Sequence, residues 1–236
     1  MPRTATPKGT GRSTGLSLAA ILLVTACFAA MVMLHAVRTD LDPVRQVMSE
    51  YANGRFGWFM TAAFYAIGLA SLVLALRLGR AIVRRAVSVV VRVLLGLGGV
   101  GLILAGIFEV ERPAVPDTIE EVIHSNATLT AFTLIIAAML LFAVLCRWDP
   151  KWHDFRAAAT MLAIVAALAG AFSPFAGQTT WSGLAQRVLG ATVVAWLLLC
   201  AWHIRFGGLR RSRPAAGSIT AGDVVVINPA AREEAR

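Results

Sequence analysis

Long apolar stretches dominate the pattern of this chain, and six of them are each about as long as a lipid bilayer is thick. A helix of roughly 20 apolar residues crosses the hydrocarbon core and satisfies its own backbone groups where no water is available. The pattern therefore predicts an all-α fold, a polytopic transmembrane bundle of six spans. The expected spans are Leu16 to Val37, Gly57 to Leu76, Val87 to Phe108, Ile123 to Cys146, Ala157 to Ala176 and Leu184 to Ile204.

The composition favours a membrane protein over a soluble one. Hydrophobic residues make up 58% of the 236 residues, charged residues make up 15%, and the mean hydropathy is +0.71. A soluble domain of this length could bury a large core, but six unbroken apolar runs would leave extended apolar patches on its surface.

The distribution of Lys and Arg predicts how the chain is threaded. With a cytoplasmic N-terminus, 17 of the 22 cations fall on the cytoplasmic side, as the positive-inside rule requires. Both termini are therefore expected in the cytoplasm. Arg outnumbers Lys by 20 to 2, which together with abundant Ala and Gly suggests a bacterial protein of the plasma (inner) membrane. The net charge of +9 follows from this topology and requires no nucleic-acid partner.

Three regions are expected along the chain. Residues 1–14 are polar and predicted to be a disordered cytoplasmic N-terminus, residues 15–206 form the transmembrane domain, and residues 207–236 form a disordered basic cytoplasmic tail. Membrane lipids are the first expected partners. Arg210, Arg211 and Arg213 in the tail are expected to bind the anionic inner leaflet.

The first outer loop predicts a short interfacial helix near residues 43–52. Asp42 and Pro43 are typical of a helix start, and Asn53-Gly54 of a helix stop. Apolar residues recur between them at helical spacing, at Val44, Val47, Met48 and Tyr51. Such a helix would lie in the outer interface or fold over the mouth of the bundle.

The second outer loop carries a helix-start signal at Thr118-Ile119-Glu120-Glu121, which has the pattern of a capping box. The fourth helix should therefore begin before its apolar run and carry His124 into the upper membrane. Glu120 and His124 would then be neighbours four residues apart.

Polar and ionisable residues gather at one depth, near the outer ends of the spans. Such groups are costly in a membrane and usually pair with one another or line a wet cavity. Arg187, a cation on the depleted side, is expected to pair with Glu109, Glu111 or another acid of the same loop. Pairs that hold the helix ends together are the simpler interpretation, and a ligand site is the alternative. The candidate residues are His35, Asp42, Ser49, Tyr51, Glu109, Glu111, Glu120, His124 and Arg187.

Small residues in the third span predict close helix packing. The run Gly96 to Gly101 spells the GxGxxG pattern of dinucleotide-binding folds, but it lies inside a membrane span with no strand before it. Gly98, Gly101 and Ala105 share one helical face, where a neighbouring backbone can approach.

Several short motifs resemble a known family. They are His35, Asp42-Pro43, Ser49-Glu50-Tyr51, Gly57-Trp58, Gly106-Ile107-Phe108, and Thr118 followed by His124. Together they resemble the bacterial six-span membrane proteins catalogued as domain of unknown function 998, over about residues 16 to 206. Members of that family often carry Pro and Asp after the Phe that closes the third span, where this chain has Glu109 and Glu111. The resemblance implies a six-span topology and supplies no reaction.

Three functional classes are compatible with the sequence. The leading hypothesis is a non-enzymatic integral membrane protein that binds a lipid, a small ligand or an envelope-protein partner through its outer cluster, without a cofactor. A homo-oligomer is also possible. The alternative is an intramembrane metal-dependent lipid hydrolase that holds zinc through His35, His124, Glu109 and Glu111, because two imidazoles and a carboxylate leave a zinc position open for water. The third is a small transporter, which the scarcity of polar groups at mid-depth disfavours.

Overall fold

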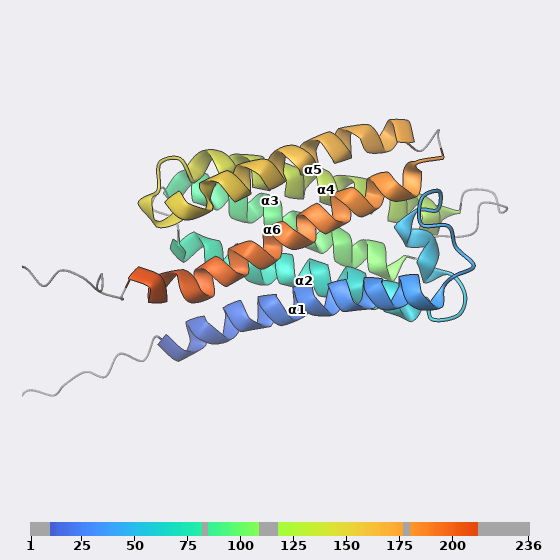
Figure 1. The fold of residues 1–236 in the computed structure, drawn as a ribbon, viewed down its shortest axis with the longest axis horizontal. Coiled ribbons are helices and arrows are strands. Elements are labelled where there is room, and N and C mark those ends of the chain that lie inside the picture. The colour runs from blue at the N-terminus through green and yellow to red at the C-terminus, as the bar shows by residue number, and fades with distance from the viewer. Residues whose placement is uncertain (1–9, 82–84, 109–117, 177–179, 212–236) are drawn as a thin grey trace, which may run out of the picture.

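Six long helices form the molecule, as the sequence predicts, in a computed structural model that describes residues 10–81, 85–108, 118–176 and 180–211 (Figure 1). All six are long and apolar enough to cross a membrane. Two 3-10 helices, η1 and η2, accompany them. The elements are α1 Thr10–Val37, η1 Met48–Ala52, α2 Trp58–Ala81, α3 Arg85–Ile107, α4 Ile119–Leu145, η2 Pro150–Phe155, α5 Arg156–Ala176 and α6 Ser182–Arg211.

The first and last long helices, α1 and α6, extend past the expected limits of the transmembrane domain. α1 begins at Thr10 and α6 continues to Arg211, whereas the apolar pattern places the domain at residues 15–206. A helix needs apolar side chains only where it lies in lipid, so polar residues can continue it beyond the membrane. Residues 1–9 and 212–236, which include Arg213, lie outside the described part of the chain.

The helices close into a ring in chain order. Each packs against the next along the chain, and α1 also packs against α6. Successive helices run in opposite directions, so α1 begins and α6 ends at the same end of the bundle (Figure 1). We call this the terminal end, and the opposite end, where η1 lies, the η1 end.

Glycines let α3 approach both of its neighbours. A Cβ atom at Gly98 would lie 2.6 Å from Ile135 Cγ1, and one at Gly101 would lie 2.9 Å from Ala131 Cβ, both on α4. On the other side, a Cβ at Gly99 would lie 2.7 Å from the carbonyl oxygen of Gly68 on α2. The predicted packing role of Gly98 and Gly101 is confirmed.

The two ends of the bundle differ in their interior. At the terminal end, Phe142 of α4 stands edge-on to Trp152 of η2 and to Trp196 of α6, with ring centroids 4.9 and 5.5 Å apart. All three side chains are buried and fill the core there. The η1 end instead contains two cavities.

The structure differs from the predicted interfacial helix near residues 43–52 in both the length and the type of helix. Asp42 begins a tight turn, accepting a hydrogen bond from Val44 N at 2.8 Å through its carboxylate, and only Met48–Ala52 is helical, as a 3-10 segment. The physical reason is competition for the backbone. The carbonyls of Val44, Arg45 and Gln46 accept hydrogen bonds from residues of α6 in place of the local bonds of a helix. Gly54 adopts a left-handed conformation, with φ 81°, which is typical of a glycine that follows a helix.

Candidate functional site

The α1–α2 loop lies over the first turns of α6. Leu184 N donates to the carbonyl of Val44 at 3.0 Å, and the Ser182 hydroxyl donates to that of Arg45 at 2.5 Å. In return, Met48 N donates to Gln186 Oε1 at 2.9 Å. Of the two placements that the sequence allows, this is the one in which the loop folds over the bundle.

Arg187 is the polar centre beneath this loop. Its Nε donates to His35 Nε2 at 2.8 Å, and its Nη1 donates to the carbonyls of Gln46 at 2.8 Å and Gly183 at 2.9 Å. One side chain thus joins α1, the loop and α6. Its Nη2 is buried and has no hydrogen-bond partner in the part of the chain that the structure describes.

The contacts of His35 fix its tautomer. A guanidinium nitrogen can only donate, so His35 Nε2 must accept, and Nδ1 carries the proton that is donated to the carbonyl of Met31 at 2.6 Å. The imidazole is therefore neutral. The Tyr51 ring is fully buried, 5.2 Å from the His35 ring and 5.2 Å from Arg187 Cζ.

Arg187 has no carboxylate partner among residues 10–81, 85–108, 118–176 and 180–211. The predicted partners Glu109 and Glu111 lie outside these ranges. Asp42 instead pairs with Arg45, 3.6 Å away, and Glu50 accepts from Val47 N at 3.2 Å. In the described structure, a neutral histidine and two carbonyls take the place of the expected acid.

His124 joins α4 to the end of α3. Thr118 caps α4 as predicted, accepting from Glu121 N at 3.2 Å, and this places His124 facing inward with 4% of its surface exposed. Its Nδ1 donates to the carbonyls of Ala105 at 2.7 Å and Phe108 at 2.9 Å, which have no further turn of α3 to bind them. Glu120 is exposed four residues earlier.

Two cavities occupy the η1 end. One, of about 600 Å³, lies between α4, α5 and α6 and has polar groups in its wall. The other, of about 390 Å³, lies between α1, α2 and α6 and is apolar except for His35 and Arg187. Both volumes are in the range of ligand pockets, roughly 300–1,000 Å³. The walls of the two cavities share Met48, Met60, Phe64 and Phe132.

The candidate residues therefore divide into separate groups. His35 and Arg187 line the smaller cavity, whereas Ser49 and His124 line the larger one. Sequence reasoning missed Gln186, which lines the larger cavity and holds the loop. A signal existed, because Gln186 is a polar residue in the first turns of an apolar span, a placement that usually has a function.

A metal site would require rearrangement of His35, because both of its ring nitrogens are already in hydrogen bonds. Among the residues with described positions, no group of three or more His, Cys, Asp or Glu side chains is arranged to hold a metal ion.

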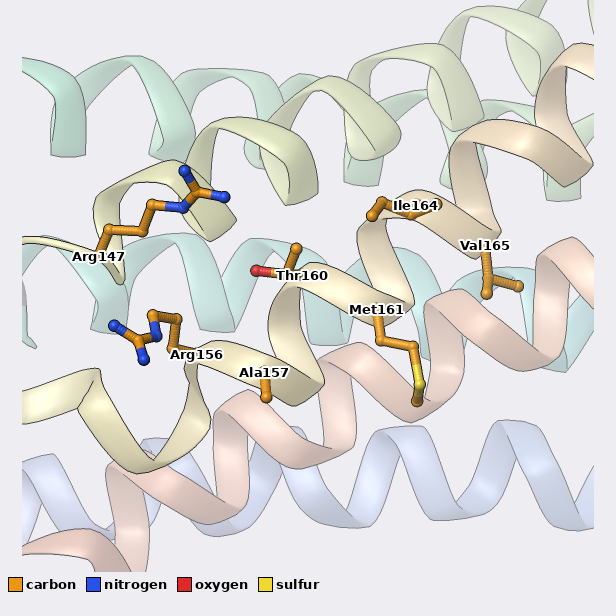
Figure 2. A pocket seen from close by; sticks show the side chains of 7 residues that line it. All are labelled: Arg147, Arg156, Ala157, Thr160, Met161, Ile164 and Val165. Carbon is orange, nitrogen blue, oxygen red and sulfur yellow. The ribbon is translucent and has the colours of Figure 1, made fainter.

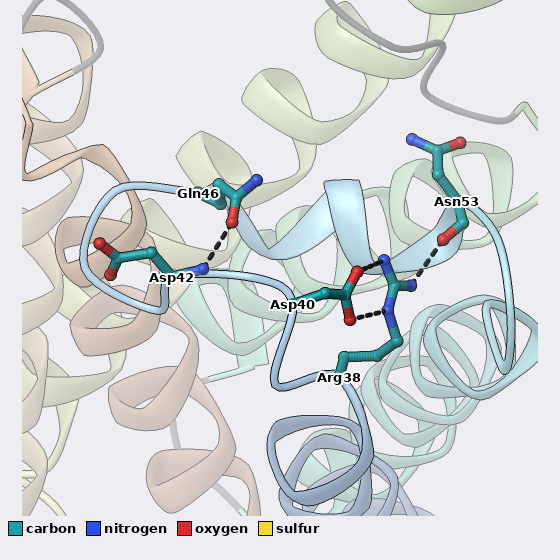
Figure 3. A network of polar contacts seen from close by, with 5 residues as sticks. All are labelled: Arg38, Asp40, Asp42, Gln46 and Asn53. Carbon is teal, nitrogen blue, oxygen red and sulfur yellow. Dashed lines mark hydrogen bonds and ion pairs between the residues drawn. The ribbon is translucent and has the colours of Figure 1, made fainter.

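A charged network stiffens the loop outside the cavities (Figure 3). Arg38 donates two hydrogen bonds of 2.9 Å to the Asp40 carboxylate and one of 2.6 Å to the carbonyl of Asn53. These bonds hold the pKa of the Asp40 carboxyl below its usual value. They also tie the beginning of the loop to its end.

At the terminal end, a groove of about 650 Å³ lies on the bundle surface beside α5 (Figure 2). Arg147, just after α4, and Arg156, the first residue of α5, stand at its mouth, and Thr160 lies next to them. The remaining lining is apolar.

One comparison with known proteins identifies a family. A family model described as Protein of unknown function (DUF998) matches residues 18–203. The chain belongs to this family. The DUF998 match runs from α1 to α6 and contains the loop, both cavities and the groove, which confirms the family resemblance seen in the sequence. Neither the curated proteins nor the solved structures gave a match. The description of DUF998 names no activity, so the function has to be argued from the site.

Proposed function

We propose that this multi-pass membrane protein binds an amphiphile, an apolar chain with an anionic head, in the cavities at the η1 end. The observation that carries the proposal is Arg187, a partly buried guanidinium in the wall of an otherwise apolar cavity. A buried charge is costly unless it is paired, and its described partners are all neutral. A carboxylate or phosphate head would supply the missing charge.

The walls of the cavity support an apolar chain as the rest of the ligand. Phe28, Met31 and Val32 of α1 face Ala191 and Val194 of α6 across it. Phe28 and Val32 are 59% and 54% exposed, so the cavity reaches the surface of the bundle that would contact lipid. A membrane amphiphile could enter from the bilayer between α1 and α6.

The unequal distribution of Lys and Arg between the two ends of the bundle indicates on which side of the membrane the cavities open. Most of the Lys and Arg residues that the structure describes lie at the terminal end, which the positive-inside rule assigns to the cytoplasm. The cavities would then open in the outer half of the bacterial plasma membrane. Ligand binding there, with no reaction, is the function that we propose.

Competition between two ligands tests the proposal in detergent solution. A dansyl-labelled undecanoic acid would be bound first and displaced by oleate or by methyl oleate, which differ in the charge of the head. We expect oleate to displace the probe at a concentration at least about tenfold lower, because hydrogen bonds to charged groups contribute about 1.5–3 kcal/mol. Arg187→Gln should remove this preference, and the control Arg45→Gln, at an exposed arginine of the same end, should retain it.

A second pair of variants distinguishes the contribution of the cavity to binding from that of the Arg187 charge. Ala191→Phe places a ring in the smaller cavity and should weaken both ligands, whereas Leu199→Phe on the exposed face of the same helix should weaken neither. Equal displacement by oleate and methyl oleate in the wild-type protein would contradict an anionic head. Absence of saturable displacement by either ligand would contradict the binding function itself.

A further inference from the structure

We propose that the groove at the terminal end is a second, separate binding site, specific for an anionic phospholipid of the adjacent leaflet. The ligand would place its phosphate between Arg147 and Arg156 and one acyl chain along α5 (Figure 2). This site is independent of the cavities at the η1 end.

The charged mouth of the groove suits a phosphate. Arg147 and Arg156 are both exposed, and neither guanidinium group has a hydrogen bond or an ion pair with another described residue. The Thr160 hydroxyl points toward the gap between them (Figure 2). No acid lines the groove. Guanidinium groups bind phosphate oxygens through paired hydrogen bonds, and a hydroxyl adds a further donor.

The apolar part of the groove suits an acyl chain. Ala157, Met161, Ile164 and Val165 follow the arginines with the spacing of one helical face, and the last three are 61%, 50% and 37% exposed. From Arg156 to Val165 the helix rises about 14 Å at 1.5 Å per residue. This is about half of the roughly 30 Å hydrocarbon core, the depth of one leaflet. A lipid from the leaflet on the same side therefore matches the groove in both charge and length.

An anionic lipid is favoured over a zwitterionic one. Two cations in a groove that no acid lines attract net negative charge, and a choline or ethanolamine group would bring a third positive charge to the same place. Basic pockets between helices on the cytoplasmic side are known sites for anionic head groups.

Native mass spectrometry of the full chain tests this site. The protein would be released from nanodiscs that contain equal amounts of phosphatidylglycerol and phosphatidylcholine, and the retained lipids counted. We expect retention of phosphatidylglycerol in preference to phosphatidylcholine. Arg147→Gln and Arg156→Gln should each reduce the preference about fivefold, the effect of one cation near an anionic surface. Arg205→Gln, at the same end but outside the groove, should leave it unchanged.

A second pair of variants keeps both arginines in place. Thr160→Glu would put a carboxylate between the guanidinium groups and displace the phosphate, whereas Thr160→Gln has a similar size and no charge. We expect the lipid preference to be lost only with Glu. Equal retention of the two lipids by the wild-type protein would overturn the proposal. It would also be overturned if Arg205→Gln lowered the preference as much as the groove variants, because the effect would then be one of net charge.

Discussion

Arg187 on α6 donates its Nε hydrogen to Nε2 of His35 on α1, across 2.8 Å and 152 positions of sequence. The bond joins the first long helix to the last and closes the ring of helices at the η1 end. It also holds the arginine at the polar edge of the smaller cavity.

Removing the acceptor should loosen this closure. His35→Ala leaves a second donor of Arg187 without a partner, and an unsatisfied buried donor costs about 1–3 kcal/mol. His35→Gln retains an oxygen that can accept and should cost less. The measurement is the thermal unfolding midpoint in detergent, with His153→Ala at an exposed histidine as the control. Equal midpoints for His35→Ala and the wild-type protein would show that the bond contributes nothing to stability.

The glycines of α3 give a prediction with an internal control. Gly98→Ala and Gly99→Ala would place a Cβ 2.6 Å from Ile135 Cγ1 and 2.7 Å from the Gly68 carbonyl oxygen, so the Ile135 side chain or the α2 backbone must shift. Overpacking of this kind costs about 1–3 kcal/mol. At Gly96 the nearest atoms are 4.0 Å away, so Gly96→Ala should be neutral or stabilising. Indistinguishable thermal midpoints for the three variants would contradict the close packing of α3.

These glycines also show what the sequence could predict. Six spans, the Thr118 cap and the small-residue face of α3 depend on periodicity and local spacing, which a single sequence displays. The form of the α1–α2 loop depends on α6, about 138 residues later. Side chains and backbone of α6 donate to the carbonyls that a local helix would use. Local propensity could not reveal that competition.

The candidate site was predictable only in part for the same reason. A common depth for His35, His124 and Arg187 followed from their positions in the spans. Their distribution between two cavities depends on how helix faces rotate and on where bulky residues such as Phe64 and Phe132 leave space. These are properties of packing, and no spacing rule records them.

Docking of the loop on α6 should depend on Gly183. A Cβ at this position would collide with the carbonyl oxygens of Gln46 and Pro43, so Gly183→Ala should push the loop away from the helix. Exposed Arg45 would then become a better site for trypsin. Limited proteolysis in detergent measures the rate of cleavage there. Gly190→Ala is the matched control, because its Cβ would meet Met48 Sδ at an ordinary 3.5 Å. Slow cleavage in both variants would argue against this mode of docking.

The Arg38–Asp40 pair predicts a pH dependence of the loop. Because the hydrogen bonds from Arg38 lower the pKa of Asp40 in the folded protein, the pair stabilises the fold above the ordinary carboxyl value of about 3.8 and is lost as the pH falls below it. Asp40→Asn should therefore lower the thermal midpoint slightly at pH 6, and the difference from the wild-type protein should shrink at pH 3. Asp154→Asn, at a carboxylate that is 90% exposed, serves as the control. A difference that grew on acidification would have the wrong sign for this pair.

The orientation of the chain across the membrane, predicted from the distribution of Lys and Arg, can be tested on living cells by introducing one cysteine at a time. Arg45→Cys puts a thiol in the exposed loop at the η1 end, and Lys151→Cys puts one at the terminal end, while the native thiols at positions 27, 146 and 200 are buried. If the η1 end faces outward, a membrane-impermeant maleimide should label Arg45→Cys in intact bacteria and Lys151→Cys only after lysis. The reverse pattern would place the groove in the outer leaflet and the cavities on the cytoplasmic side. The lipid of the groove would then come from the outer leaflet, and the cavity ligand would enter from the inner one.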